Sequence, residues 1–206
     1  MMVVIVDYGM GNIGSLVKML RRLDAAPRVS REPADLSGAS HLILPGVGSF
    51  ERAARSIDAI PDLREHLSEV VQDRRTPILG ICLGMQLLVD ASDEGEGAGF
   101  GWIKGRCKRL TPTAETRVPH MGWNKVSISR DDPLIANVDM ESKFYFVHSY
   151  AVALERASDE LLATTHGTSF PSAIRSGNVM GVQFHPEKSH RHGLNILRNF
   201  LEIEGC

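Results

Sequence analysis

The stretch PILGICLG at residues 77–84 decides the fold of this chain. Residues 77–81 form a short apolar run typical of a buried strand, and the composition beyond Gly84 favours a helix. A cysteine between two such elements, in the pattern G-x-C-x-G, has the form of a nucleophile elbow. The sharp turn is expected to expose the thiol of Cys82 and to leave no room for β-carbons at Gly80 and Gly84. A small buried cysteine in a tight turn is the alternative.

Strand and helix patterns alternate along the N-terminal half of the chain. Residues 3–7 (VVIVD) and 41–45 (HLILP) predict strands, and a weaker strand is expected near residues 27–30. Apolar residues at helical spacing follow at 13–23 and 63–71. This alternation predicts an α/β fold with a mostly parallel central sheet and helices on both faces. The ligand site of such a sheet lies at the carboxyl ends of its strands.

The second half of the chain has a different pattern. The segment DEGEGAGFGW at 93–102 is predicted to be a surface loop, because it carries four glycines in ten residues and no helical period. Strand patterns follow at 125–129, 143–154, 172–176 and 179–184. Turn signals separate them, so a smaller antiparallel sheet is expected before a final helix at 191–204. Without repeats or a linker, residues 1–206 are expected to form one domain.

Composition argues against several classes of function. The 206 residues are 43% apolar and 23% charged, as in a globular domain with a substantial core. A net charge of -2 without a long basic run argues against nucleic acid or an anionic membrane as a partner. The opening MMVVIV is too short for a signal peptide or a membrane span. Cys82, Cys107 and Cys206 lack paired spacing, which suits reduced thiols in a cytoplasmic protein.

A thiolate nucleophile needs a base and a group that orients the base. The stretch VQFHPEKS at 182–189 contains both. A strand delivers His185 to a loop, and Pro186 restricts the backbone so that Glu187 can turn back toward the imidazole. Cys82, His185 and Glu187 therefore form a candidate catalytic triad.

Acyl transfer also needs donors for the tetrahedral oxyanion. The backbone N–H of Leu83, directly after the nucleophile, is the first candidate. The second is LPGVGSF at 44–50, because Gly46 and Gly48 allow the backbone to turn an N–H inward. An ordinary strand-to-helix turn is the alternative for this stretch. The following SFERAARSI at 49–57 is expected to be a solvated helix.

Two other kinds of site are disfavoured. His185, His190 and His192 resemble a metal cluster, but basic residues lie among them and no acidic or cysteine ligand completes the pattern. The glycines of VDYGMGN at 6–12 follow a strand as in a dinucleotide loop, but no acidic residue about twenty positions on ends a clear second strand. No metal and no cofactor is therefore expected.

Two stretches together carry a family resemblance. GICLGMQ at 80–86 and FHPEKS at 184–189 resemble the class I, or triad, glutamine amidotransferases, which have a flavodoxin-like fold. PGVGSF, PHMGWN, YFVHSY and VDYGMGN are similar to the glutaminase subunits of imidazole glycerol phosphate synthase within that family. Family members that serve anthranilate or carbamoyl phosphate synthesis tend to carry His where Met85 stands, and those that serve pyridoxal phosphate synthesis carry a GGES-like loop instead of PGVG.

The resemblance implies a reaction and its site. Cys82 would attack the side-chain amide of L-glutamine, His185 would pass a proton to the departing ammonia, and Glu187 would orient His185. Water would then release glutamate. The residues implied to bind the substrate are Gly46, Val47, Gly48, Leu83, Gln86, His148, Ser149 and Tyr150. Spacing independently favours Gln86, because a residue four positions after Cys82 lies on the same helix face.

The resemblance also implies a partner. The ammonia would pass to the cyclase subunit, a (β/α)8 barrel, in a heterodimer that serves histidine biosynthesis. The loop at 46–49 would complete the oxyanion hole when the cyclase is occupied. Two alternatives remain: a glutaminase that serves another synthase, and a binding module that keeps the fold without the chemistry.

Overall fold

The computed structural model describes residues 2–204, so Cys206 lies outside the described part of the chain. Its strands are β1 (Val3–Val6), β2 (Arg28–Ser30), β3 (His41–Leu44), β4 (Ile78–Ile81), β5 (Ala91–Ser92), β6 (Gly105–Arg109), β7 (His120–Lys125), β8 (Ser127–Ile128), β9 (Lys143–His148), β10 (Tyr150–Leu154), β11 (Glu160–His166), β12 (Thr168–Ser176) and β13 (Val179–Val182). Its α-helices are α1 (Ile13–Arg21), α2 (Pro33–Ser37), α3 (Phe50–Asp58), α4 (Leu63–Ser68), α5 (Leu83–Leu87) and α6 (His190–Glu202). Shorter turns are the π-helical turn Glu69–Asp73 and the 3-10 turns Pro133–Ile135, Ala157–Asp159 and Pro186–Lys188.

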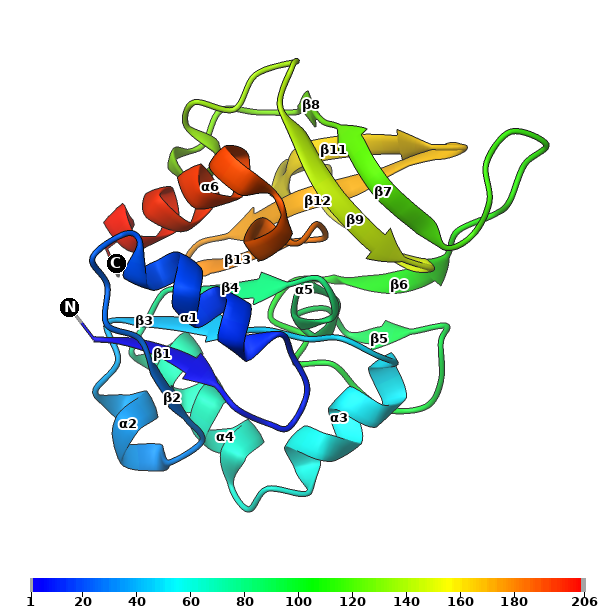
Figure 1. Cartoon of the computed structure of the whole chain (residues 1–206). Coiled ribbons are helices and arrows are strands. Elements are labelled where there is room, and N and C mark those ends of the chain that lie inside the picture. The colour runs from blue at the N-terminus through cyan, green and yellow to red at the C-terminus, as the bar shows by residue number, and fades with distance from the viewer. Residues whose placement is uncertain (1, 205–206) are drawn as a thin grey trace.

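A large central sheet organises the fold (Figure 1). Its eight described strands run in the order β2-β1-β3-β4-β13-β12-β11-β8. The strands from β2 to β13 pair in parallel, and β12, β11 and β8 pair antiparallel beyond them. The predicted α/β class with a mostly parallel central sheet is therefore confirmed.

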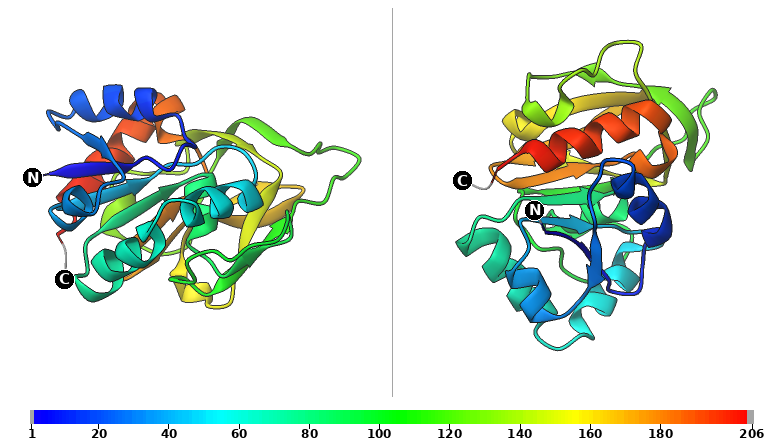
Figure 2. Two further views of the ribbon diagram at one scale, coloured as in Figure 1. Left: turned by 90° about the horizontal axis from the view of Figure 1, so that it is seen from below. Right: turned by 60° about the vertical axis from the view of Figure 1, so that its left-hand side comes forward.

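Alternation along the strands explains why helices cover both faces. On β1, Val3 and Ile5 pack in one apolar cluster, whereas Val4 and Val6 pack in the other. Side chains of a strand point alternately to opposite faces, so a continuous apolar run needs cover on both sides. Helices α1 and α6 cover one face and α2 to α5 the other, as the core clusters and two views of the chain agree (Figures 1 and 2).

Two smaller sheets complete the structure. Strands β10, β6 and β5 form one sheet, and β7 pairs antiparallel with β9 to form the other. The predicted strand at 143–154 is therefore two strands, β9 and β10, which separate at Ser149 and pair in different sheets. The sequence patterns also missed β6, because only Gly105 and Cys107 of its GRCKR sequence are buried.

The stretch at 49–57 is helical, as expected, but it is not fully solvated. Phe50, Ala53, Ala54 and Ile57 of α3 are buried, and this i, i+3, i+4, i+7 spacing gives the helix one apolar face. Across residues 2–204, no helix is long and apolar enough to cross a membrane.

Candidate active site

Cys82 lies at a sharp turn between β4 and α5. Its backbone has φ +55° and ψ −110°, a strained conformation for a residue with a β-carbon. A β-carbon on Gly80 would lie 2.6 Å from the carbonyl oxygen of Gly84, and one on Gly84 would overlap the carbonyl oxygen of Leu44. Both glycines are therefore required by close backbone approach, which is the steric reason expected for the G-x-C-x-G pattern.

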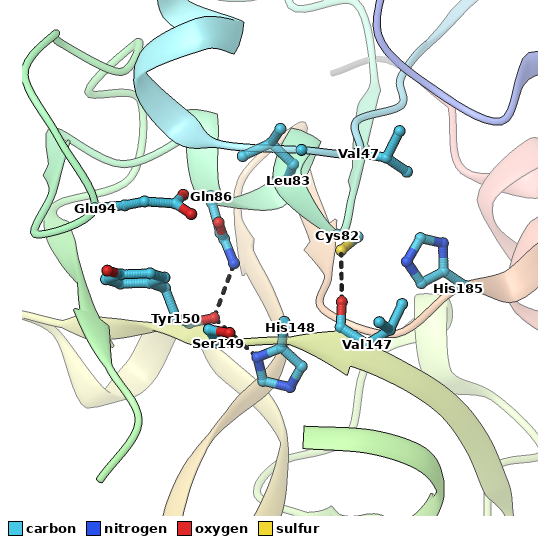
Figure 3. A pocket seen from close by; sticks show the side chains of 11 residues that line it. Val47, Cys82, Leu83, Gln86, Glu94, Val147, His148, Ser149, Tyr150 and His185 are labelled. Carbon is cyan, nitrogen blue, oxygen red and sulfur yellow. Dashed lines mark hydrogen bonds between the residues drawn. The ribbon is translucent and has the colours of Figure 1, made fainter. Parts of the chain in front are cut away.

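The strand order brings three loops together at one edge of the sheet. Val47 and Gly48 follow β3, Cys82 follows β4, and His185 comes three residues after the end of β13. These strands are neighbours and parallel, so their carboxyl ends meet. The loops border a cavity of about 170 Å³ (Figure 3). Its lining residues are Val47, Gly48, Cys82, Leu83, Gln86, Glu94, Val147, His148, Ser149, Tyr150 and His185.

The imidazole of His185 is oriented by a buried carboxylate. Nδ1 of His185 lies 2.8 Å from Oε1 of Glu187, and their side chains are 2% and 1% exposed. The 3-10 turn Pro186–Lys188 carries Glu187 back beside the ring. Glu187 does not line the cavity and lies behind the imidazole of His185. Nε2 of His185 has no hydrogen-bond partner among residues 2–204 and remains available for proton transfer.

The groups around His185 favour its protonated form. Burial alone would lower the pKa of His185, but the nearby Cys82 and Glu187 raise it well above its ordinary value. An imidazolium next to Cys82 stabilises the thiolate, which is the nucleophilic form. In the uncharged site the thiol donates to the carbonyl oxygen of Val147 at 3.9 Å and accepts from Nε2 of Gln183 at 3.7 Å.

Seven of the eight expected substrate-binding residues line the cavity, and Gly46 does not. A β-carbon on Gly46 would lie 2.7 Å from both the backbone nitrogen of Gly84 and the hydroxyl oxygen of Tyr8. Gly46 therefore allows the loop after β3 to pass close to the elbow. The hydroxyl of Tyr8 donates to the carbonyl oxygen of Pro45 at 2.6 Å, and burial raises the pKa of this tyrosine, so it stays a neutral donor.

Sequence reasoning missed three residues at the site. Glu94 contributes the only carboxylate among the described lining residues, and Oε2 of Glu94 also accepts from the backbone N–H of Phe50 at 2.8 Å. Val147 contributes its carbonyl oxygen to the thiol. Gln183 is fully buried and joins Gln86 to Cys82. Gln183 and His185 both follow the end of β13, so strand alternation gave no signal that would place Gln183 at the site.

The three histidines that resemble a metal cluster in sequence have separate contacts. His190 stacks on Trp123 with ring centroids 5.2 Å apart, and His192 lies 3.3 Å from Nε of Arg191. Nδ1 of His185 is engaged by Glu187. No group of three His, Cys, Asp or Glu side chains within residues 2–204 is placed to hold a metal ion.

Known proteins resemble this chain over almost its full length. The family described as "Glutamine amidotransferase class-I" matches residues 4–203. Imidazole glycerol phosphate synthase subunit HisH 2 of Pseudomonas aeruginosa is 41% identical, with 98% of this chain and 100% of that protein covered. The HisH subunit of Bdellovibrio bacteriovorus is 42% identical, with coverages of 98% and 100%, and that of Xylella fastidiosa is 43% identical, with coverages of 99% and 98%.

Solved structures share the fold at lower identity. A glutamine amidotransferase from Thermotoga maritima has a TM-score of 0.69 at 17% identity, covering 98% of this chain and 96% of that one. PurLQS from the same organism has a TM-score of 0.73 at 17% identity, with coverages of 98% and 97%. The fold, the family match and the sequence identities over nearly the full length of these relatives agree with the resemblance seen in the sequence motifs. The chain belongs to the class-I glutamine amidotransferases and, within them, to the HisH subunits of imidazole glycerol phosphate synthase.

Proposed function

We propose that this protein hydrolyses L-glutamine to glutamate and ammonia, using Cys82, His185 and Glu187, and passes the ammonia to a partner subunit for histidine biosynthesis. The observation that carries the proposal is the shared cavity of Cys82 and His185, with Glu187 held 2.8 Å behind the imidazole. A nucleophile, a base and an oriented carboxylate are the three groups that acyl transfer of this type requires. The proposed reaction uses these side chains, backbone donors for the oxyanion and water, and it calls for no cofactor.

The proposed reaction has two halves. The thiolate of Cys82 attacks the carbonyl carbon of the side-chain amide, and its electron pair forms the C–S bond while the carbonyl oxygen becomes an oxyanion. Protonated His185 then gives its proton to the amide nitrogen, the C–N bond breaks, and ammonia leaves a thioester. In the second half His185 takes a proton from water, the resulting hydroxide attacks the thioester, and the C–S bond breaks to release glutamate. Glu187 holds the imidazole through both halves.

The cavity offers complementary groups for the rest of the substrate. Glu94 supplies a negative charge for the α-ammonium group of glutamine. Gln86 donates from Nε2 to the carbonyl oxygen of Tyr150 at 2.9 Å and to Oε1 of Gln183 at 3.0 Å, which leaves its own Oε1 for the substrate. His148, Ser149 and Tyr150 border the same end of the cavity (Figure 3).

The oxyanion would be bound by the backbone N–H of Leu83 and by the loop that contains Val47 and Gly48. Gly48 has φ +110°, a conformation open to glycine, and both loop residues line the cavity. Gly46 would not contact the substrate; its lack of a β-carbon would allow the loop to pass close to the elbow at Cys82. We expect a change in this loop to complete the oxyanion hole when the partner's site is occupied.

The partner is proposed to be the cyclase subunit, a (β/α)8 barrel, in a heterodimer located in the cytoplasm. Residues 1–206 would act as a single amidotransferase domain. Val47, which lines the cavity, is 43% exposed, and Met121 and Trp123 on β7 are 62% and 47% exposed. Such exposed apolar side chains suit a protein partner. A covered path would keep ammonia from protonation in water, which would remove its nucleophilicity.

The test is a glutamate-release assay on the chain with the cyclase subunit. Cys82→Ser is expected to abolish glutamate release and to retain cyclase binding. Cys107→Ser is the matched control, because Cys107 is also buried but lies outside the cavity. Equal activity of Cys82→Ser and the wild type would overturn the chemistry. Equal rates with and without a ligand of the cyclase would overturn the loop switch, and failure to bind the cyclase would overturn the partner.

A further inference from the structure

A chain of buried hydrogen bonds begins on strand β7, outside the cavity. His120 is only 3% exposed and does not line the cavity, whereas His148, opposite it on β9, does. Nδ1 of His120 lies 3.0 Å from Nε2 of His148. Nδ1 of His148 lies 2.8 Å from the carbonyl oxygen of Tyr150. His120 is thus one side chain away from the residues proposed to hold the substrate.

The same chain continues to the catalytic sulfur. The carbonyl oxygen of Tyr150 also accepts from Nε2 of Gln86 at 2.9 Å (Figure 3). That nitrogen donates to Oε1 of Gln183 at 3.0 Å, and Nε2 of Gln183 donates to Sγ of Cys82 at 3.7 Å. A displacement of His148 would therefore move the cavity-lining segment at Tyr150 directly. It would reach Cys82 only through the additional hydrogen bonds of Gln86 and Gln183.

One protonation state satisfies every link. Nδ2 of Asn124 lies 3.2 Å from Nε2 of His120 and can only donate, so the proton of His120 is on Nδ1 and is donated to His148. His148 in turn carries its proton on Nδ1 and donates it to Tyr150. A second proton on either ring would set two donors against each other. Burial, above all, lowers the pKa of His120 to about 3 and that of His148 to about 4, so both rings stay neutral.

Packing fixes the plane of the His120 ring. Its centroid lies 4.7 Å from that of Phe146 and 4.1 Å from that of His166, and both rings are stacked on it. Stacking holds the plane, and the bonds to Asn124 and His148 determine which nitrogen faces inward. The direction of the Nδ1 donor is therefore set from two sides.

We propose that His120 is a positioning residue for glutamine, which acts through His148 on the segment at 147–150 that lines the cavity. The inference rests on the proposed glutaminase activity. Because His120 supports residues that bind the substrate before and during the reaction alike, its loss should weaken substrate binding and leave the chemical step nearly intact. The relevant atom is the Nδ1 donor and not the aromatic ring.

The experiment measures KM and kcat for glutamine on the chain with its cyclase partner, for the wild type, Cys82→Ser and variants of His120. His120→Phe, which keeps an aromatic ring, is expected to raise KM about tenfold with kcat within about threefold of the wild type. His120→Asn places an amide nitrogen where Nδ1 stood and should return KM to within about threefold. His120→Gln places its donor farther from the backbone and should not. His166→Phe, which keeps the stacking on His120, should leave KM unchanged.

The outcomes separate this inference from the activity on which it rests. A wild type that releases no more glutamate than Cys82→Ser would overturn the proposed function. An active wild type with an equal KM in His120→Phe would overturn only the role of His120. If His120→Phe does not fold, the Asn and Gln pair still decides the matter, because equal KM values in these two variants would show that the Nδ1 donor has no role.

Discussion

The buried histidine pair predicts a measurable dependence of stability on pH. Burial and the neighbouring His148 and His166 lower the pKa of His120 from 6.5 to about 3 in the folded state. Below pH 6.5, His120 is therefore protonated in the unfolded chain but stays neutral in the folded one. The free energy of unfolding falls as the pH decreases from 6.5 toward 3. Between pH 7.5 and 5.0 this residue alone should remove about 2 kcal/mol from the free energy of unfolding.

His120→Phe removes this contribution while it keeps a stacked ring. At pH 7.5 the variant should be less stable than the wild type by about 1 kcal/mol, because Nε2 of His148 loses a hydrogen bond. Between pH 7.5 and 5.0 it should then lose about 2 kcal/mol less than the wild type, so the order of stability reverses at the acidic end.

The assay is urea unfolding at several pH values between these limits, with the free energy extrapolated to water. Groups that do not contact His120 are common to both proteins and cancel in the difference. His148 loses the donor that faces its Nε2 in His120→Phe, so it accepts a proton more readily in the folded variant and adds to the difference in the same direction. Parallel losses of stability in the wild type and His120→Phe would refute the reasoning, because they would mean that His120 is protonated as readily in the folded state as in the unfolded chain.

Three further predictions test the elbow, the proposed triad and a buried carboxylate with two arginine partners. Gly84→Ala should lower the free energy of unfolding by about 2 kcal/mol, because its β-carbon would overlap the carbonyl oxygen of Leu44; Gly14→Ala, in open space on α1, should not lower it in the same urea titration. Glu187→Gln should lower kcat at least about a hundredfold, since the neutral amide no longer stabilises the imidazolium. An NMR titration should show a lower pKa for His185 in this variant, and an unchanged pKa would contradict the proposed role of Glu187. Asp132→Asn should lower the free energy of unfolding by about 3 kcal/mol, because the carboxylate of Asp132 accepts from Arg175 at 2.9 Å and from Arg130 at 3.2 Å. The control in the same thermal unfolding assay is Glu141→Gln, which removes an exposed ion pair with Lys125 and should change stability by less than about 1 kcal/mol.

Much of the fold was predictable because the signals are local. The apolar runs of β1, β3 and β4 and the helical spacing of α1 and α6 each lie within one short segment. The pattern of residues 80–84 predicts its own steric cause, since the crowding of a β-carbon on Gly80 comes from Gly84 four positions away. The elbow and its cysteine were therefore identifiable from the local pattern, although the crowding at Gly84 comes from Leu44, which is distant in the sequence.

The missed parts depend on pairing that is distant in sequence. Ser149 lies between β9 and β10, and the predicted strand is divided there only because β9 and β10 pair in different sheets. Glu94 lies in a glycine-rich segment without periodicity, and its place in the cavity comes from the path of that loop past the N-terminus of α3. Gln183 and His120 have polar partners up to 101 positions away, so their local patterns describe a buried strand and nothing more.

By itself, the sequence determined the alternation of strands and helices in the first half of the chain, the apolar runs of β1, β3 and β4, and the elbow around Cys82, because each of these depends on neighbours along the chain. Only the tertiary structure decided which loops border one cavity, that Glu187 lies behind the imidazole of His185, and that His120 is hydrogen-bonded to a residue that lines the cavity. Hydrogen bonds depend on distance and direction in space, and segments far apart in the sequence acquire these only when strands β3, β4 and β13 align their carboxyl ends.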